Sequence, residues 1–216
     1  MTRFLALFAL CFVPGFAVQA EGPTPVLVEL FASQNCSACP KAHKTMREVS
    51  ADREDVFVLT WSVDYWDYLG DPDPMALDEA KARQATYAEN FGIRAPYTPQ
   101  SVYDGVKECP GPRKKAVLRN ITERLDEDRV NSISLARAAS GFTVSGQSDE
   151  ALELTLIEYL DGDDNTTTMV NPVTSATSLG LWTGQSEPVQ VNCARSCAVL
   201  LHKPDYGEII NVLKFN

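Results

Sequence analysis

Along the first half of the chain, short apolar runs alternate with segments in which apolar residues recur at helical spacing. The runs Pro25–Ala32 and Val56–Trp61 are rich in β-branched residues and predict two buried strands. Between them, Ala42, Met46 and Val49 fall on one helical face. Two apolar strands joined by a helix predict a parallel β-α-β unit with a right-handed crossover.

The next segment predicts two more helices and two more strands. They are a helix over Met75–Phe91, a strand over Gln100–Tyr103, a strand over Val106–Glu108 and a helix that opens at Pro112. Asp104-Gly105 is a typical hairpin turn, so the two strands should pair antiparallel. In the last helix, Leu118, Ile121 and Leu125 share one face. The resulting order, β-α-β-α-β-β-α, is that of a minimal thioredoxin-like, glutaredoxin-type core.

The pattern changes after Val130, where single apolar residues alternate with polar ones. The alternating positions are Ile133 and Leu135, Phe142 and Val144, and Leu152, Leu154 and Leu156. Turn residues separate these segments, and two last strands are predicted over Ala198–His202 and Glu208–Phe215. The two-residue period predicts antiparallel strands in a β-rich, sandwich-like C-terminal domain. We place the thioredoxin-like domain at residues 21–128 and the β-rich domain at residues 129–216.

The first twenty residues have the pattern of an export signal. Arg3 precedes the apolar run Phe4–Val13, and Ala17–Ala20 supplies small residues for cleavage before Glu21. The run of about ten apolar residues is half of what a membrane-spanning helix needs. We therefore interpret residues 1–20 as a signal peptide and expect a periplasmic or secreted protein, with no membrane span in its mature chain.

The net charge excludes some classes of partner, and the cysteine count indicates how many thiols can be paired. The formal net charge of −10 argues against nucleic acid or an anionic membrane surface, because both would be repelled. Export permits disulfides. Five of the six cysteines lie beyond the predicted signal, so at least one thiol is free or shared with a partner.

Cys36-Ser37-Ala38-Cys39 carries the strongest chemical signal, because it lies between a predicted strand and the start of a predicted helix. A Cys-x-x-Cys pair in a β-α-β unit is typical of thiol–disulfide exchange, whereas a zinc site needs four ligands. The helix N-terminus should lower the pKa of the Cys36 thiol and make it the attacking nucleophile. Cys39 faces inward and is suited to resolve a mixed disulfide. This exchange needs neither a cofactor nor a metal; a structural disulfide or a metal-binding pair is the alternative.

Thr98-Pro99 is a candidate substrate-binding segment. Thioredoxin-like folds carry a cis-proline before their third strand, where it faces the dithiol and the backbone beside it pairs with the substrate. Here Thr98-Pro99 directly precedes the strand predicted at Gln100–Tyr103. An ordinary trans proline is the alternative, because only about 5–6% of X–Pro bonds are cis, and Pro96 competes for the position.

The loop after the second strand is another candidate part of the site. It leaves the carboxyl edge of the parallel strands, as the dithiol loop does, and ligands usually bind at that edge. We expect Tyr65 and Trp66 to line a substrate groove, with Asp64 or Asp67 as a candidate proton acceptor for the second cysteine. The alternative is a loop packed by its own aromatic side chains. His43 is expected to face solvent.

Cys193 and Cys197 form a second cysteine pair, in the β-rich segment. Four strand steps would separate their Cα atoms by about 13 Å, whereas a disulfide needs less than about 7 Å. They can therefore form the structural disulfide that we favour only if residues 194–196 make a turn. The alternative is a soft-metal site with His202, similar to the copper site of some thioredoxin-like assembly factors.

Several segments resemble the secreted family catalogued as domain of unknown function 1223. The resemblance lies in Val28–Pro40, Val63–Gly70 and Tyr97–Gln100, with weaker matches at Gly180–Trp182 and Gly207–Ile209. It implies a thioredoxin-like domain followed by a β-rich region, in a bacterial envelope protein. It implies no substrate, and the cysteines beyond residue 100 lie outside its pattern.

These observations favour an exported thiol–disulfide oxidoreductase that acts on protein thiols and disulfides through Cys36 and Cys39. Two alternatives stay open at this point. One is a non-catalytic, thioredoxin-like binding module with a structural disulfide, and the other is a copper-handling protein.

Overall fold

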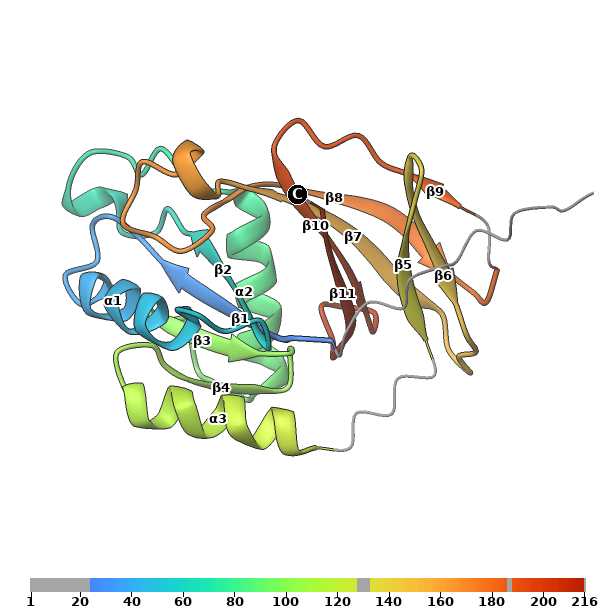
Figure 1. Ribbon diagram of the computed structural model, residues 1–216. Coiled ribbons are helices and arrows are strands. Elements are labelled where there is room, and N and C mark those ends of the chain that lie inside the picture. Colours follow the sequence, from blue (N-terminus) through green and yellow to red (C-terminus); the bar gives the residue numbers. More distant parts are fainter. Residues whose placement is uncertain (1–23, 128–132, 186–187, 216) are drawn as a thin grey trace, which may run out of the picture.

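The computed structural model describes residues 24–127, 133–185 and 188–215. The predicted signal peptide, residues 1–20, and the predicted domain boundary at residues 128 and 129 lie outside these ranges. Within them the chain is mixed α/β, with three sheets and with the long helices gathered at one end of the molecule (Figure 1). None of the helices in these ranges combines the length and the hydrophobicity that a membrane-spanning helix requires.

The first sheet has the strand order β2-β1-β3-β4, and only β1 and β2 are parallel among its described pairs. Its strands are β1 (Val26–Ala32), β2 (Val56–Ser62), β3 (Gln100–Tyr103) and β4 (Lys107–Pro110). The helices beside it are α1 (Cys39–Ser50), α2 (Asp78–Asn90), α3 (Lys114–Asp126) and the short 3-10 helix η1 (Asp67–Leu69). Because side chains alternate along a strand, Val28 and Leu30 pack with α1 and α3, whereas Leu27 and Phe31 pack with α2.

The order of these elements is the order that the sequence predicts. Two helices begin later than expected, and the one predicted to open at Pro112 begins at Lys114. The helix predicted from Met75 begins at Asp78, because Ala76 instead forms a parallel bridge with Ser62 at the end of β2.

The buried face of α3 also differs from the predicted one. Leu118 is 37% exposed, whereas Val117 and Ile121 are buried against the sheet. The same side of the helix continues with Arg124, whose Nε donates to the Asp104 carboxylate at 3.0 Å. The spacing of apolar residues alone could not identify this buried face of α3, because one of its members is the charged residue Arg124.

The second half of the chain forms two antiparallel sheets, with strand orders β11-β10-β7-β8 and β5-β6-β9. Their strands are β5 (Ser134–Ala138), β6 (Gly141–Ser145), β7 (Leu152–Tyr159), β8 (Val173–Trp182), β9 (Val189–Gln190), β10 (Ser196–His202) and β11 (Ile209–Phe215). A shared hydrophobic cluster holds the two sheets together, with Phe142 and Val144 on one side and Leu154 and Val199 on the other.

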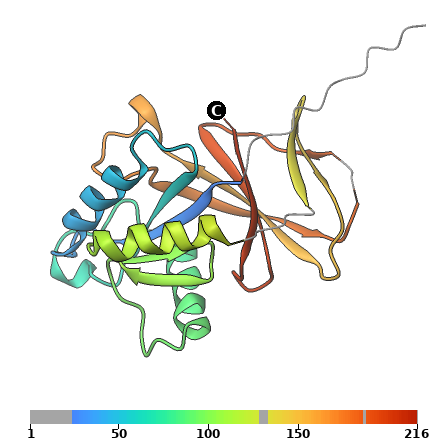
Figure 2. The ribbon, with the colours of Figure 1, turned by 60° about the horizontal axis from the view of Figure 1, so that its bottom comes forward.

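Strand β10 is buried on both faces and joins the two halves of the molecule. Its residues Cys197, Val199 and Leu201 belong to the cluster between the two antiparallel sheets, whereas Ala198 and Leu200 pack with the α2 side of the first sheet. The two halves therefore share a hydrophobic core, as their close contact in Figures 1 and 2 also shows.

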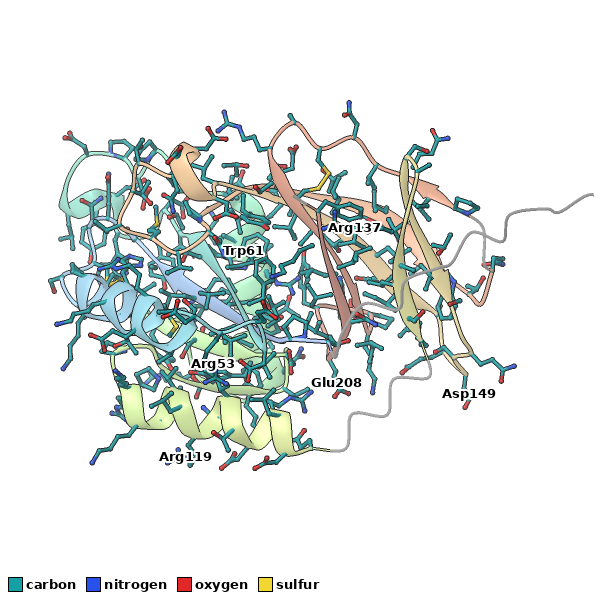
Figure 3. All side chains as sticks on the ribbon, viewed as in Figure 1. Arg53, Trp61, Arg119, Arg137, Asp149 and Glu208 are labelled. Atoms are coloured by element: carbon teal, nitrogen blue, oxygen red, sulfur yellow. A yellow bond between two sulfur atoms is a disulfide. The ribbon has the colours of Figure 1, made fainter. Side chains whose placement is uncertain are left out.

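A buried polar cluster lies within this junction. The Glu29 carboxylate accepts hydrogen bonds from Arg83 Nε at 2.6 Å, Tyr87 Oη at 2.5 Å and Trp61 Nε1 at 3.0 Å. Figure 3 shows Trp61 where the first sheet meets the second half of the molecule. The Arg83 guanidinium also lies 4.9 Å from the ring centre of Tyr206, which precedes β11. An ion pair thus sits inside an otherwise apolar core.

The β7–β8 connection crosses from the second half of the molecule to the first. It includes the short 3-10 helix η2 (Gly162–Asp164) and lies beside α1 in both views (Figures 1 and 2). Thr60 on β2 holds it there, since its N–H donates to the Asn171 carbonyl at 3.1 Å and its hydroxyl to the Val170 carbonyl at 2.7 Å. This loop of the β-rich half therefore lies close to the N-terminal end of α1.

Candidate functional site

The dithiol lies where β1 leads into α1. Cys39 is the first residue of α1, and its N–H donates to the Cys36 carbonyl at 3.0 Å. The two sulfur atoms form a disulfide, with the Cα atoms 5.4 Å apart. Cys36 is 6% exposed and Cys39 is 1% exposed. Both cysteines are therefore buried, and Cys36 is slightly less so than Cys39.

The loop between β2 and α2 holds the dithiol loop in place. The N–H of Gln34 donates to the Asp73 carboxylate at 2.8 Å, and Asn35 Nδ2 donates to the Asp71 carbonyl at 2.8 Å. Gly70 permits this approach, because a Cβ atom there would lie 2.5 Å from Asn35 Oδ1. Sequence reasoning missed these contacts, which join residues more than thirty positions apart.

The two aromatic residues of the predicted groove lie on different sides of their loop. Trp66 packs against the cluster that contains Cys36 and Cys39, and its Nε1 donates to Thr98 Oγ1 at 2.7 Å. Tyr65 packs instead against the α2 side of the sheet, where its hydroxyl donates to Gln84 at 3.2 Å. Burial raises the pKa of Tyr65 to about 12. Both side chains therefore reach Thr98, because the Tyr65 hydroxyl also hydrogen-bonds with it. Only Trp66 also packs in the cluster that contains the dithiol.

Thr98 and Pro99 lie close to α1. The Thr98–Pro99 peptide bond is cis, as the sequence predicts. The Pro99 carbonyl accepts a hydrogen bond from the Gly111 N–H at 3.0 Å. A Cβ atom on Gly111 would lie 3.0 Å from Ala42 on α1 and 3.7 Å from the Pro99 ring. Gly111 therefore fits between Pro99 and the first turns of the dithiol helix.

The two carboxylates proposed as proton acceptors are bound to other groups. Asp64 pairs with Lys81 on α2, at 2.6 Å. Asp67 Oδ1 accepts the N–H of Asp73 at 3.1 Å and Asn35 Nδ2 at 3.4 Å. Their described contacts organise the loop and involve neither cysteine.

A pocket of about 330 Å³ opens beside Cys39. Its walls come from the dithiol loop, the first turns of α1, the segment before α2 and the β7–β8 connection. The lining residues include Cys39, Pro40, His43, Asp73, Met75 and Met169. Sequence reasoning did not find this pocket, because one wall comes from Thr167–Met169, more than a hundred residues away.

His43 is buried in the wall of this pocket, so the expectation that it faces solvent is wrong. Its side chain is 7% exposed. The residues that line the pocket with it, Asp73 and Met169 among them, cover the face of α1 that it occupies. Burial lowers the pKa of His43 to about 4; the positive charge of Arg47 adds to this, and Asp73 opposes it.

Cys193 and Cys197 lie at disulfide distance, with their Cα atoms 6.0 Å apart. A bend at residues 194 and 195 brings them together, as a disulfide at this spacing requires. His202 is not part of this pair, because its ring nitrogens contact Thr155 Oγ1 at 2.9 Å and the Lys203 carbonyl at 2.8 Å. Across the described ranges, no group of three His, Cys, Asp or Glu side chains is placed to hold a metal ion.

Cys109 is a free, buried thiol on β4. Its sulfur lies 3.3 Å from Tyr103 Oη and 3.6 Å from Ser101 Oγ. Burial, and to a lesser degree the Cys109 sulfur, raises the pKa of Tyr103 above its ordinary value. The thiol therefore belongs to a small polar cluster of three side chains inside the core.

Comparison with known proteins gives a family and a fold, without an activity. A crystal structure of protein AGR_C_4864 from Agrobacterium tumefaciens is similar over 91% of this chain and 96% of that one, with a TM-score of 0.74 and 24% identity. HBP35 of Porphyromonas gingivalis is similar over 91% of this chain and 76% of that one, with a TM-score of 0.54 and 11% identity. No protein with a curated description matches the sequence. The model of the family described as "Protein of unknown function (DUF1223)" matches residues 27–201, and the chain therefore belongs to this family.

Proposed function

We propose that the protein is an exported thiol–disulfide oxidoreductase, in which a thioredoxin-like first half carries the dithiol and a β-sandwich forms the second half. The observation that carries this proposal is the place of Cys36 and Cys39 at the N-terminal end of α1, where β1 ends. The β1-α1-β2-α2-β3-β4-α3 order and the central position of β1 in its sheet support the thioredoxin-like assignment.

The helix end favours the chemistry of Cys36. The first N–H groups of a helix lack partners within the helix, and the aligned peptide dipoles make this end positive. A thiolate at this end is stabilised, so we expect the pKa of the reduced Cys36 thiol to fall below the free value of about 8.5. Cys36 is also slightly less buried than Cys39, at 6% against 1% exposed, which agrees with its role as the cysteine that meets the substrate first.

The exchange proceeds in two steps. The Cys36 thiolate attacks a sulfur of the substrate disulfide, forms a mixed disulfide and releases the first substrate thiolate. The Cys39 sulfur then attacks Cys36 Sγ, which forms the Cys36–Cys39 disulfide and releases the second substrate thiolate. Two electrons pass from the dithiol to the substrate, and the reverse sequence oxidises a substrate dithiol.

The surface around the η1 loop suits a polypeptide substrate. Tyr68 is 75% exposed and Leu69 is 58% exposed, although both are large apolar side chains. The ring of Tyr68 lies 6.1 Å from that of Trp66, which binds Thr98 next to Pro99. We propose that a substrate segment lies between this apolar surface and Thr98–Pro99, with its sulfur over Cys36.

Trapping of mixed disulfides tests this function. A Cys39→Ala variant cannot resolve the intermediate and should hold partner proteins covalently through Cys36. The matched control, Cys36→Ala, lacks the attacking sulfur and should hold none. If Cys39→Ala captures no protein thiol from an envelope extract and exchanges no small disulfide, the oxidoreductase proposal is wrong.

A further inference from the structure

His43 contains a buried ring nitrogen without a hydrogen-bond partner. Among the described residues, no donor or acceptor reaches its Nδ1 atom. A buried polar atom left in this way costs about 1–3 kcal/mol. His202 shows the more usual arrangement, because both of its ring nitrogens have partners. The cost at His43 therefore calls for an explanation.

The position of His43 relative to Cys39 explains why its Nδ1 atom has no partner. The two residues lie four positions apart on α1, and both line the same pocket. Residues at this spacing share a helix face, with Cβ atoms about 5–6 Å apart. Side chains on a helix also lean toward its N-terminus, so the His43 ring leans toward Cys39. The His43 ring thus lies on the side of the helix that carries Cys39.

The charged groups that act on the ring are engaged with other partners. The Asp73 carboxylate accepts the N–H groups of Gln34 and Met75, at 2.8 and 2.9 Å. Arg47 donates to the carbonyl of Thr168 in the β7–β8 connection. Since burial holds the pKa of His43 near 4, the ring is neutral at pH 7 and one of its nitrogens is an acceptor.

We propose that Nδ1 of His43 is the proton acceptor for Cys39 in the resolving step. This inference rests on the proposed exchange function and names the group that activates its second cysteine. In the disulfide form, Cys39 has no proton to donate, so Nδ1 lacks a partner. In the dithiol form, the Cys39 thiol donates a hydrogen bond to Nδ1. Asp64 and Asp67, bound elsewhere, take no part.

The proton and electrons balance as follows. The Cys39 S–H bond breaks, and its proton moves to Nδ1 of His43. The electron pair left on the Cys39 sulfur forms the bond to Cys36 Sγ, while the bond between Cys36 and the substrate sulfur breaks. The substrate leaves as a thiolate, and the imidazolium gives its proton to this thiolate or to water, which restores the neutral ring. Asp73, which also lines the pocket, stabilises the transient positive charge, as does the negative charge that develops on the Cys39 sulfur. Both raise the pKa of the ring above its resting value near 4 while the proton is transferred.

The small number of histidines allows a direct test, because the chain contains only His43 and His202. The mature protein labelled with ¹⁵N-histidine would be compared by long-range ¹H–¹⁵N NMR in its oxidised form and after reduction with dithiothreitol. The Nδ1 resonance of His43 should shift on reduction, whereas the His202 resonances should stay in place. The His43 shift should vanish in Cys39→Ala. An unchanged His43 Nδ1 resonance in the wild-type protein would overturn the proposal.

The two steps can also be separated in time. Reduced protein mixed with 5,5′-dithiobis(2-nitrobenzoate) releases one coloured thiolate when Cys36 attacks and a second when Cys39 resolves the mixed disulfide. His43→Phe should leave the first phase unchanged and slow the second by about a hundredfold, as expected for loss of a general base. His43→Asn keeps a polar atom near the place of Nδ1 but cannot take the proton. It should fold normally and show the same slow second phase; a wild-type second phase in this variant would contradict the proposal.

These experiments do not depend on a protein partner. If Cys39→Ala traps no protein but the His43 resonance and the second phase respond as described, the proton transfer stands and the choice of protein substrates fails. If partners are trapped and neither signal responds, the exchange function stands and the role of His43 fails.

Discussion

The two faces of the first sheet bury ionisable groups in opposite ways. On the α2 face, Glu29 and Arg83 are almost fully buried, and the Glu29 carboxylate accepts three different donors. Burial lowers the pKa of Arg83, but the Glu29 carboxylate outweighs it and leaves the pKa above its ordinary value. On the α1 face, His43 is almost as buried, yet its Nδ1 has no partner among the described residues.

In the mechanism that we propose, this difference separates a structural cluster from a reactive one. The Glu29–Arg83 cluster has its hydrogen bonds formed and fixes how the two halves of the molecule meet. The Nδ1 atom of His43 can instead bind the proton that Cys39 carries only in the dithiol form. A missing partner does not by itself mark a functional residue, because Asn120 Nδ2 also lacks one among the described residues. At His43, the pocket shared with Cys39 makes the difference.

The largest effect is expected from the dithiol itself. Cys36→Ala should lower the rate of disulfide exchange by at least about a thousandfold, because the attacking sulfur is lost. Replacement of both Cys193 and Cys197 by alanine should leave this rate unchanged. Both changes open short loops, so each should cost about 2 kcal/mol of folding free energy. A fluorescent disulfide substrate measures the exchange rate, and urea unfolding measures the folding free energy. If both variants lose exchange equally, the assignment of Cys36–Cys39 as the reactive disulfide and of Cys193–Cys197 as the structural one is wrong.

Substitutions on the α2 face of the first sheet should change the stability of the protein but not its exchange rate. Arg83→Met leaves the Glu29 carboxylate buried without its charged partner and should cost about 3–5 kcal/mol in free energy of unfolding. The exposed Lys81→Met, which removes the pair with Asp64, should cost no more than about 1 kcal/mol. The rate of disulfide exchange per folded molecule should be the same in both variants. An Arg83→Met protein that stays folded but loses exchange would show that the α2 face takes part in the reaction.

Both histidines, His43 on α1 and His202 on β10, should make stability depend on pH. Burial lowers the pKa of His43 and of His202 to about 4, from an unfolded value near 6.5. Between these values the unfolded chain binds more protons, so stability is full above pH 6.5 and falls as the pH decreases. The expected loss is about 2 kcal/mol per histidine between pH 7 and 5. Urea midpoints should show it, and His43→Asn should remove about half; a flat profile would contradict the burial of both rings.

The smallest effect is expected at Trp66. Trp66→Phe keeps the apolar surface but removes the N–H that binds Thr98, a hydrogen bond worth about 1 kcal/mol. KM for a disulfide-containing polypeptide should rise about fivefold, while the reaction with a small disulfide should not change. Trp182→Phe is the matched control, because it also removes an indole N–H bond, to the Gln185 carbonyl at 2.6 Å in the β-rich half. An equal rise in KM for Trp182→Phe would contradict the placement of the groove beside Trp66.

Local patterns in the sequence could predict the frame of the first half. The apolar runs at β1 and β2, the helical stripe through Ala42 and Met46, and the Asp104-Gly105 turn each depend on neighbouring residues. The place of the dithiol at a helix start follows from the same patterns. These features needed no knowledge of the rest of the chain.

Features set by distant contacts could not be predicted in this way. Strand β8 was missed because most of its side chains are small or polar, and its identity as a strand depends on pairing with β7. The burial of Arg83 depends on Glu29, which lies on another element and 54 positions away. His43 looked exposed because its cover, Thr167–Met169, lies far along the chain.

That cover has a consequence for how the family can diversify. Cys36, Cys39 and His43 precede the link between α3 and β5, whereas Thr167–Met169, one wall of the pocket beside them, follow it. Recombination between two members within this link would exchange that wall and leave the dithiol and His43 untouched. If the proposed function holds, selection can therefore alter what enters the pocket without altering the sulfur chemistry.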